Sequence, residues 1–311
     1  MNVSSLDYSG REYTIGTVLV LATVIIWGVQ FPIAKHTFAT VDAFHSAVFR
    51  FTLPALVLTV ALVLREGWPA LRSGPDTIRI FGLGLMGMCA APSLIFGGLM
   101  FTRPEIAAII VATQPLLTVL VQRVIGGEKP GIGSLLCVFV AFAGVVTVVT
   151  RWNTTLDISS VEIAANVMVL LGALCFVIYT IYCVRFQHWT SLRLTTLCMI
   201  SGAVANTLLV VALVTMGLLT QPSVADWFQV RWELLFLAIA GVLGAMFTWI
   251  LGARRIGPLN AMLFINLIPI VTFAVRYLQG YRFETVELLG ATMVLGALTT
   301  QNLLMRMQKY R

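Results

Sequence analysis

The sequence has few charged residues and lacks the arrangements of them that a membrane-embedded enzyme needs. Of its 311 residues only 11% are charged, whereas 59% are hydrophobic, and the mean hydropathy is +0.95. Intramembrane proteolysis requires paired aspartates, a Ser/His arrangement or zinc ligands. All the aspartates lie in expected connections or in the N-terminal tail, and the histidines show no ligand spacing. We therefore expect no enzyme, no metal and no cofactor.

The sequence also lacks paired cysteine spacings and a removable signal peptide. Its five cysteines lie in or beside hydrophobic runs, as small buried side chains do. The first dozen residues carry both charge signs and lack the apolar core of a signal peptide. The net charge of +7 is not a nucleic-acid signal, because the cations cluster at the ends of hydrophobic segments. The expected partners are the lipid bilayer and a small-molecule solute, and the oligomeric state is left open.

Hydrophobic segments of membrane-spanning length account for about two-thirds of the chain. A helix needs roughly 20 mostly apolar residues to cross a bilayer. Clusters of glycine, proline and charged residues separate the segments. The expected spans are 14–34, 43–64, 78–100, 104–124, 132–150, 161–184, 194–218, 232–252, 259–279 and 285–305. The sequence thus predicts an all-α integral membrane protein with ten transmembrane helices.

One stretch of sequence recurs in the second half of the chain at a constant offset of 154 positions. The recurring residues are Pro104, Ala107, Pro115, Thr118 and Gly126, which return as Pro258, Ala261, Pro269, Thr272 and Gly280. A repeat of five spans contains an odd number, so the second copy enters the membrane in the opposite sense. Inverted repeats with broken helices are common in secondary transporters, which bind substrate where the halves meet. We expect repeats at 14–150 and 161–305, a connecting loop at 151–160, and tails at 1–13 and 306–311.

The distribution of lysine and arginine predicts the orientation of the chain. These residues are about twice as frequent in one set of alternate connections, together with both termini, as in the other set. Because cytoplasmic loops carry the excess of positive charge, both termini are expected in the cytoplasm.

The chain resembles the drug/metabolite transporter superfamily, and within it the ten-helix EamA-type members, over about residues 14–305. The residues that carry the resemblance are Trp27-Gly28, Phe31-Pro32 and Lys35 in the first span, Arg50 in the second, Ala107-Ala108, Gln114-Pro115 and Gly126-Gly127-Glu128 in and after the fourth, and Ala261, Pro269 and Gly280 in and after the ninth. Tyr281-Arg282 departs from the family's Gly-Glu pattern in the second half. The resemblance implies a basket of two inverted five-helix repeats around a central cavity, in the bacterial inner membrane. Known activities of such proteins include export of amino acids and other small metabolites.

Polar and aromatic side chains deep within the spans are the candidates for solute binding. Gln114 directly precedes Pro115, and Asn266 lies three residues before Pro269. Proline frees backbone carbonyls of the preceding turn, so each amide lies in a polar patch that either binds solute or only joins two helices. The predicted substrate-binding residues are Trp27, Gln30, Gln114, Phe176, Tyr179, Trp249 and Asn266, and the predicted helix kinks are at Pro115 and Pro269.

A few charged residues are candidates for substrate attraction or coupling. Arg50 lies about two turns inside the second span. There it either serves the structure, by reaching the headgroups or bonding to carbonyls, or attracts a carboxylate together with Arg103 and Lys35. The middle of the membrane is expected to hold no carboxylate, which favours facilitated diffusion or exchange. Glu105, at the start of the fourth span, is a peripheral candidate for proton coupling.

The sequence therefore favours a transporter that exports small metabolites, such as amino acids or related amphipathic solutes, by alternating access. Another solute class, such as nucleotide sugars, organic anions or drug-like compounds, stays open as an alternative. Phosphate recognition needs converging cations, whereas the spans offer amides and aromatic rings. A membrane-embedded enzyme or a channel fits less well, because the residues that either would need are missing.

Overall fold

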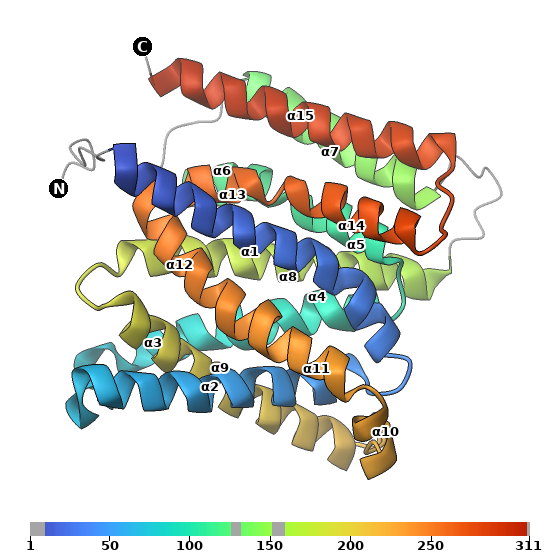
Figure 1. Cartoon of the computed structure of the whole chain (residues 1–311). Coiled ribbons are helices and arrows are strands. Elements are labelled where there is room, and N and C mark those ends of the chain that lie inside the picture. Colours follow the sequence, from blue (N-terminus) through green and yellow to red (C-terminus); the bar gives the residue numbers. More distant parts are fainter. Residues whose placement is uncertain (1–9, 126–131, 151–158, 310–311) are drawn as a thin grey trace.

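The computed structural model describes residues 10–125, 132–150 and 159–309, and helices dominate it (Figure 1). No β-strand occurs in these ranges. The helices of the first half are α1 (Gly10–Thr37), α2 (Ala43–Glu66), α3 (Thr77–Gly84), α4 (Ala91–Leu99), α5 (Pro104–Ala112), α6 (Gln114–Val124) and α7 (Ile132–Thr150). Those of the second half are α8 (Ser160–Arg185), α9 (Ser191–Thr215), α10 (Val224–Gln229), α11 (Arg231–Ala238), α12 (Ala245–Ile256), α13 (Pro258–Phe264), α14 (Leu267–Leu278) and α15 (Thr285–Lys309).

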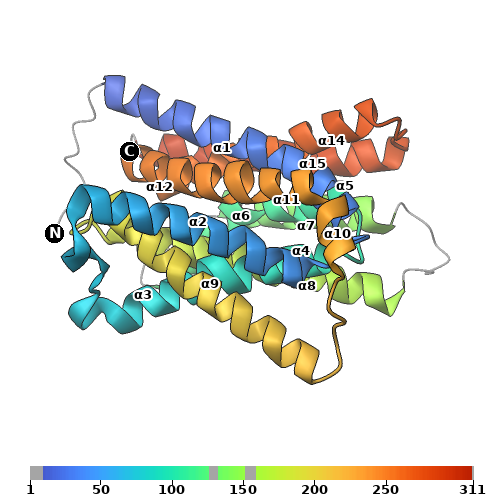
Figure 2. The ribbon, with the colours of Figure 1, turned by 60° about the horizontal axis from the view of Figure 1, so that its bottom comes forward.

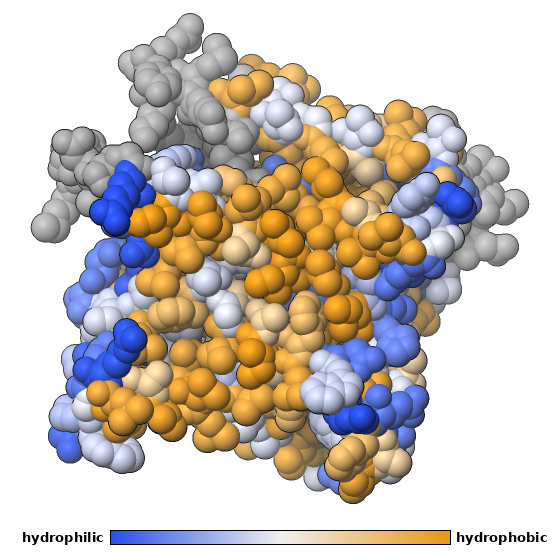
Figure 3. Space-filling view, in the orientation of Figure 1, coloured by the Kyte–Doolittle hydropathy of each residue, from blue (hydrophilic) through white to orange (hydrophobic). Residues whose placement is uncertain are grey.

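Several helical segments are long and apolar enough to cross a membrane. In the described part of the chain they are Arg11–Thr37, Ala43–Glu66, Trp68–Leu99, Pro104–Val124, Ser160–Val184, Ser191–Thr215, Arg231–Ile256 and Asn260–Leu278. The remaining two expected spans fall in α7 and α15, which contain the shorter apolar stretches Phe139–Val149 and Thr285–Thr300. Hydrophobic side chains cover the middle of the face in Figure 3, and hydrophilic residues gather at its two ends. The protein is thus an all-α, multi-pass integral membrane protein.

The two halves of the chain run in opposite directions. In Figure 1, α1 runs from left to right, whereas its counterpart α8 runs from right to left, and the same reversal relates α2 to α9 and α7 to α15. Helices of one half pack against helices of the other: α1 against α12, α4 against α8, α2 against α9, and α7 against α15. Figure 2 shows α2 and α9 side by side from a second direction. The fold is therefore a pair of interlocked, inverted repeats.

Both halves contain a π-helical segment at the same place. Leu85–Ala90 joins α3 to α4, and Ile239–Gly244 joins α11 to α12. The two segments are separated by the same 154 positions as the recurring prolines. Such segments are rare and are frequent at functional sites. Their matching positions are a structural counterpart of the sequence repeat.

The two proline-containing helices are divided rather than merely kinked. α5 ends at Ala112 before α6 begins with Gln114-Pro115, and α13 ends at Phe264 before α14 begins at Leu267. Proline lacks an N–H group and its ring clashes with the preceding turn, so the helix stops and starts again. The breaks fall at Thr113, two residues before Pro115, and at Ile265-Asn266, three to four residues before Pro269, and each produces two helices. Gly126, Gly127 and Glu128 lie outside the described residues.

Candidate functional site

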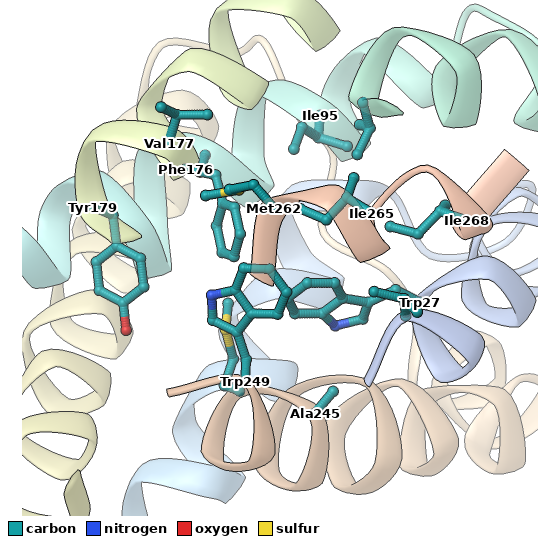
Figure 4. Close-up of a cluster of buried hydrophobic side chains, with 14 of the residues drawn as sticks. Trp27, Ile95, Phe176, Val177, Tyr179, Ala245, Trp249, Met262, Ile265 and Ile268 are labelled. Carbon is teal, nitrogen blue, oxygen red and sulfur yellow. The ribbon is translucent and has the colours of Figure 1, made fainter. Parts of the chain in front are cut away.

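Three aromatic side chains meet where α1, α8 and α12 come together (Figure 4). The ring centroid of Trp27 lies 5.4 Å from that of Phe176 and 5.2 Å from that of Trp249. The Trp27 indole donates a hydrogen bond to the carbonyl of Gly241, at 3.1 Å, in the second π-helical segment. Trp249 donates to the Thr180 hydroxyl at 3.3 Å. Both indole N–H groups therefore find partners inside the protein, which lipid could not supply.

Trp27 and Phe176 line a small cavity between the two halves, which we call the central cavity. Its volume is about 60 Å³, enough for a few water molecules and less than a metabolite needs. Phe31, Phe96 and Ile268 belong to its largely apolar wall. The polar side chains of the wall are Gln30, Arg50 and Gln114.

Arg50 is the charged residue of the central cavity. Its side chain is fully buried, with 1% of the residue exposed, so it does not reach the headgroups. The guanidinium carbon lies 4.2 Å from the ring centroid of Phe96, in a cation–π contact. Its Nε and Nη1 atoms bond to no described residue, and no acidic residue is among those lining the cavity. An uncompensated buried charge costs several kcal/mol, so a ligand anion would be strongly attracted to it.

Two side-chain amides share the cavity with Arg50. Gln114 donates from Nε2 to the carbonyl of Ala173 at 3.5 Å, which leaves its buried Oε1 without a partner. The Oε1 atom of Gln30 is also buried and unbonded within the described structure. It lies against Gly241, where a Cβ atom would come within 2.6 Å of it. The cavity thus combines unused cationic donors with unused neutral acceptors.

Three of the predicted substrate-binding residues lie outside the lining of the central cavity. Tyr179 is buried beside Phe176, with its ring against Gly87. Trp249 is fully buried behind Trp27. Asn266 lies at the division between α13 and α14, and its Oδ1 atom has no partner in the described structure. Tyr179 and Trp249 therefore support the aromatic wall from behind. Periodicity in the sequence could not separate the two layers.

A second cavity lies toward the end of the bundle where α1 ends, and we call it the vestibule. Its volume is about 630 Å³, and its polar lining includes Lys35, Arg103, Glu162 and Arg276. Lys35 follows the central-cavity residue Phe31 by four positions, a rise of about 6 Å along α1. The Lys35 ammonium donates to the carbonyls of Leu99 and Met100, at 2.9 and 2.8 Å, where α4 ends.

Ion pairs beside the vestibule join α5 to α14 and α15. Arg103 donates to Glu287 and, at 3.1 Å, to the Tyr281 hydroxyl. Tyr281 in turn donates to Glu287 at 3.2 Å. Burial raises the pKa of Tyr281, which keeps the phenol protonated as a donor. Glu105 is fully buried between Arg103 and Arg276. Arg103 and Glu105 can be singled out from the sequence, but their partners cannot, because the partners lie far away along the chain.

The sequence matches the EamA-like transporter family over residues 14–150 and 163–301. It is 26% identical over 301 residues to the uncharacterized transporter YrdR of Bacillus subtilis, covering 96% of this chain and 94% of that protein. It is 29% identical over 300 residues to the uncharacterized transporter YyaM of the same organism, covering 94% and 95%. A solved crystal structure with 18% sequence identity has the same fold, with a TM-score of 0.68 over 94% of this chain and 98% of that chain. The chain belongs to the EamA-like transporter family and is a membrane transporter, not an enzyme.

Proposed function

We propose that this transporter carries small zwitterionic metabolites, foremost amino acids, through the central cavity. The observation that carries the proposal is the buried guanidinium of Arg50, which has no acidic partner among the residues lining that cavity. A solute carboxylate would supply the missing negative charge and form charge-assisted hydrogen bonds to the unused Nε and Nη1 atoms.

The other polar groups suit the rest of an amino acid. Gln30 and Gln114 offer unbonded amide oxygens, which accept hydrogen bonds from an ammonium group. Trp27 and Phe176 offer apolar ring surface to a hydrophobic side chain. The cavity is too small for a solute in this conformation, so binding accompanies a separation of the two halves. Inverted repeats support that motion, because the two halves can exchange conformations to open either end.

We further propose that each repeat is one moving unit, with boundaries at 14–150 and 161–305. The end of the helix bundle that carries both chain termini also carries the excess of lysine and arginine, which supports a cytoplasmic location of that end in a bacterial inner membrane. The vestibule then faces outward. Export of the solute is our proposal for net direction, and it rests on the known activities of the family that the sequence resembles. Among the described residues, those that line the central cavity include no aspartate or glutamate, which supports facilitated diffusion or exchange.

A second candidate class is small organic anions without an ammonium group. Arg50 would bind the carboxylate of such an anion as well as that of an amino acid, whereas the amide oxygens of Gln30 and Gln114 would have no ammonium group to bind. Nucleotide sugars fit less well, because a diphosphate requires several converging cations and Arg50 is the cation of the central cavity.

The test is counterflow of labelled solutes in proteoliposomes that contain the purified protein. The panel holds apolar, aromatic and polar amino acids, together with matched carboxylates that lack the amino group. We expect an amino acid to give the fastest exchange, and Trp27→Ala and Gln114→Ala to reduce that exchange at least tenfold. Trp232→Ala and Gln187→Ala are the controls, since both residues are exposed. Unchanged exchange in both cavity variants, with the protein folded, would remove the proposed site.

A further inference from the structure

Glu105 is a buried carboxylate whose charged partners are two arginines. It is fully buried, and neither of its oxygen atoms accepts a hydrogen bond within the described structure. Its nearest cations are Arg276, whose Nε lies 3.4 Å from Oε2, and Arg103, whose Nη1 lies 3.9 Å from Oε1. Glu105 belongs to α5 in the first half and Arg276 to α14 in the second. The ion pair between them therefore connects the two repeats at the vestibule.

This connection is not duplicated at the other end of the bundle. Positions 154 residues away from Glu105 and Arg276 hold Leu259 and Gln122, which carry no charge. The ion pair is thus a feature of the vestibule end and not a consequence of the repeat. Ionisable residues that join moving parts inside a membrane protein are functional candidates, because their burial is costly.

The cations around the vestibule retain unused donors. Arg103 is occupied by Glu287 and Tyr281. Arg276 donates from Nη1 to Gln279, but its Nε atom has no hydrogen-bond partner in the described structure. Lys35 has three donors and uses two of them for backbone carbonyls.

We propose that the vestibule is a second carboxylate-binding site and that its ligand releases the Glu105–Arg276 ion pair. A solute carboxylate reaching Arg276 and Lys35 can form short charge-assisted hydrogen bonds, which the 3.4 Å contact to Glu105 does not provide. Glu105 then keeps Arg103 as its remaining ion-pair partner. The release frees α14 from α5, so that solute binding opens this end. The identity of the natural ligand rests on the proposed function, whereas carboxylate recognition in the vestibule does not.

The experiment measures a distance across the vestibule with isovalerate as the probe. Spin labels are attached at Phe101→Cys, an exposed position of the vestibule lining, and at Leu278→Cys, an exposed position next to the lining residue Gln279. The native cysteines of the full-length protein are replaced by alanine. Isovalerate should increase the population of the longer distance at least twofold, and isovaleramide or an equal concentration of chloride should not. Glu105→Gln and Arg276→Gln should show the longer distance without any ligand. Glu162→Gln changes a vestibule carboxylate that forms no ion pair with an arginine within the described residues; it is the matched control and should respond like the parent protein.

Either of two results would overturn the proposal. Chloride increases the population of the longer distance as much as isovalerate does, or isovalerate changes the distance in Glu105→Gln as much as it does in the parent protein. If Glu105→Gln does not fold, Arg276→Gln provides the same test. Arg50→Met separates this proposal from the proposed function, because it should abolish counterflow while the vestibule still responds to isovalerate. If the parent protein shows no change in distance with isovalerate but its counterflow still depends on Arg50, the vestibule site is wrong and the proposed function stands.

Discussion

Replacing Arg50 by methionine should separate stability from transport. A buried charge that serves only the fold is expected to destabilise the protein when removed. Arg50 has the opposite environment, because it is fully buried with two unbonded nitrogen atoms and no acidic neighbour in the cavity. We therefore expect Arg50→Met to lose solute binding, and its free energy of unfolding to fall by no more than about 1 kcal/mol or to rise.

The magnitudes follow from the contacts of the guanidinium. Removing the cation–π contact with Phe96, at 4.2 Å, costs about 0.5–2 kcal/mol. Replacing buried ionic groups by apolar ones of similar size gains about 1–4 kcal/mol in other proteins. The free energy of unfolding should therefore change by between about −1 and +3.5 kcal/mol. Losing a buried partner of the solute carboxylate costs about 2–5 kcal/mol of binding free energy, which weakens the affinity from about 30-fold to several thousand-fold.

The assay combines thermal unfolding in detergent with counterflow in proteoliposomes, both on purified protein. Arg231→Met is the matched control, since this exposed arginine also lies over a tryptophan, Trp232, and should leave counterflow unchanged. A large fall in unfolding temperature with counterflow preserved would refute the reasoning. It would mean that Arg50 stabilises the helices and does not bind solute.

Three further predictions follow from contacts elsewhere in the fold. Gly202→Ala should lower the free energy of unfolding by about 1–3 kcal/mol, because its Cβ would lie 2.2 Å from the Cβ of Met88. The control Gly82→Ala has open space around it and should not lower that free energy. Equal unfolding temperatures of the two variants would contradict this prediction. Trp27→Phe keeps an aromatic ring but loses the hydrogen bond to Gly241. It should therefore lower the free energy of unfolding, measured with denaturant, by about 0.5–1.5 kcal/mol. An unchanged free energy would show that the indole N–H is dispensable. Hydrogen bonds from Ser223 lower the pKa of Asp226, so the α10 cap is stabilised above the carboxylate's usual pKa of 3.8 and loses that stabilisation as the pH falls through the lower folded-state value. The protection of the α10 amides, which is the intrinsic exchange rate relative to their observed rate at the same pH, should therefore fall on acidification, and protection that does not change with pH would argue against the cap.

Much of the architecture is readable from the sequence, because bilayer thickness and backbone hydrogen bonding restrict a membrane protein to a few arrangements. The recurring prolines predict where the two divided helices break, since proline acts on its own preceding turn. The two π-helical segments were not predicted. Their extra residue is absorbed by packing against neighbouring helices, such as the contact of Gly87 with the Tyr179 ring, and leaves no local signal.

The candidate site was partly predictable for a similar reason. Trp27, Gln30 and Gln114 stand out because polar atoms are costly at their depth, and the structure places all three around the central cavity. Phe96 lines the same cavity but does not differ in sequence from other buried phenylalanines. The partners of Glu105 were missed, because ion pairs between α5 and α14 depend on how the inverted halves meet. Such contacts are set by tertiary packing and not by spacing along the chain.

The most direct test of solute recognition compares an amino acid with its methyl ester, in the parent protein and in Arg50→Met. The two dissociation constants are measured for the amino acid that gives the fastest counterflow. We predict that esterification weakens binding to the parent protein at least 30-fold, in keeping with loss of a buried charge pair of about 2 kcal/mol or more. Both proteins also carry Arg276→Gln, which removes the proposed carboxylate site of the vestibule, and under that condition the acid and the ester should bind Arg50→Met equally weakly. An equal loss on esterification in both proteins would contradict the account, because the carboxylate would then be recognised elsewhere.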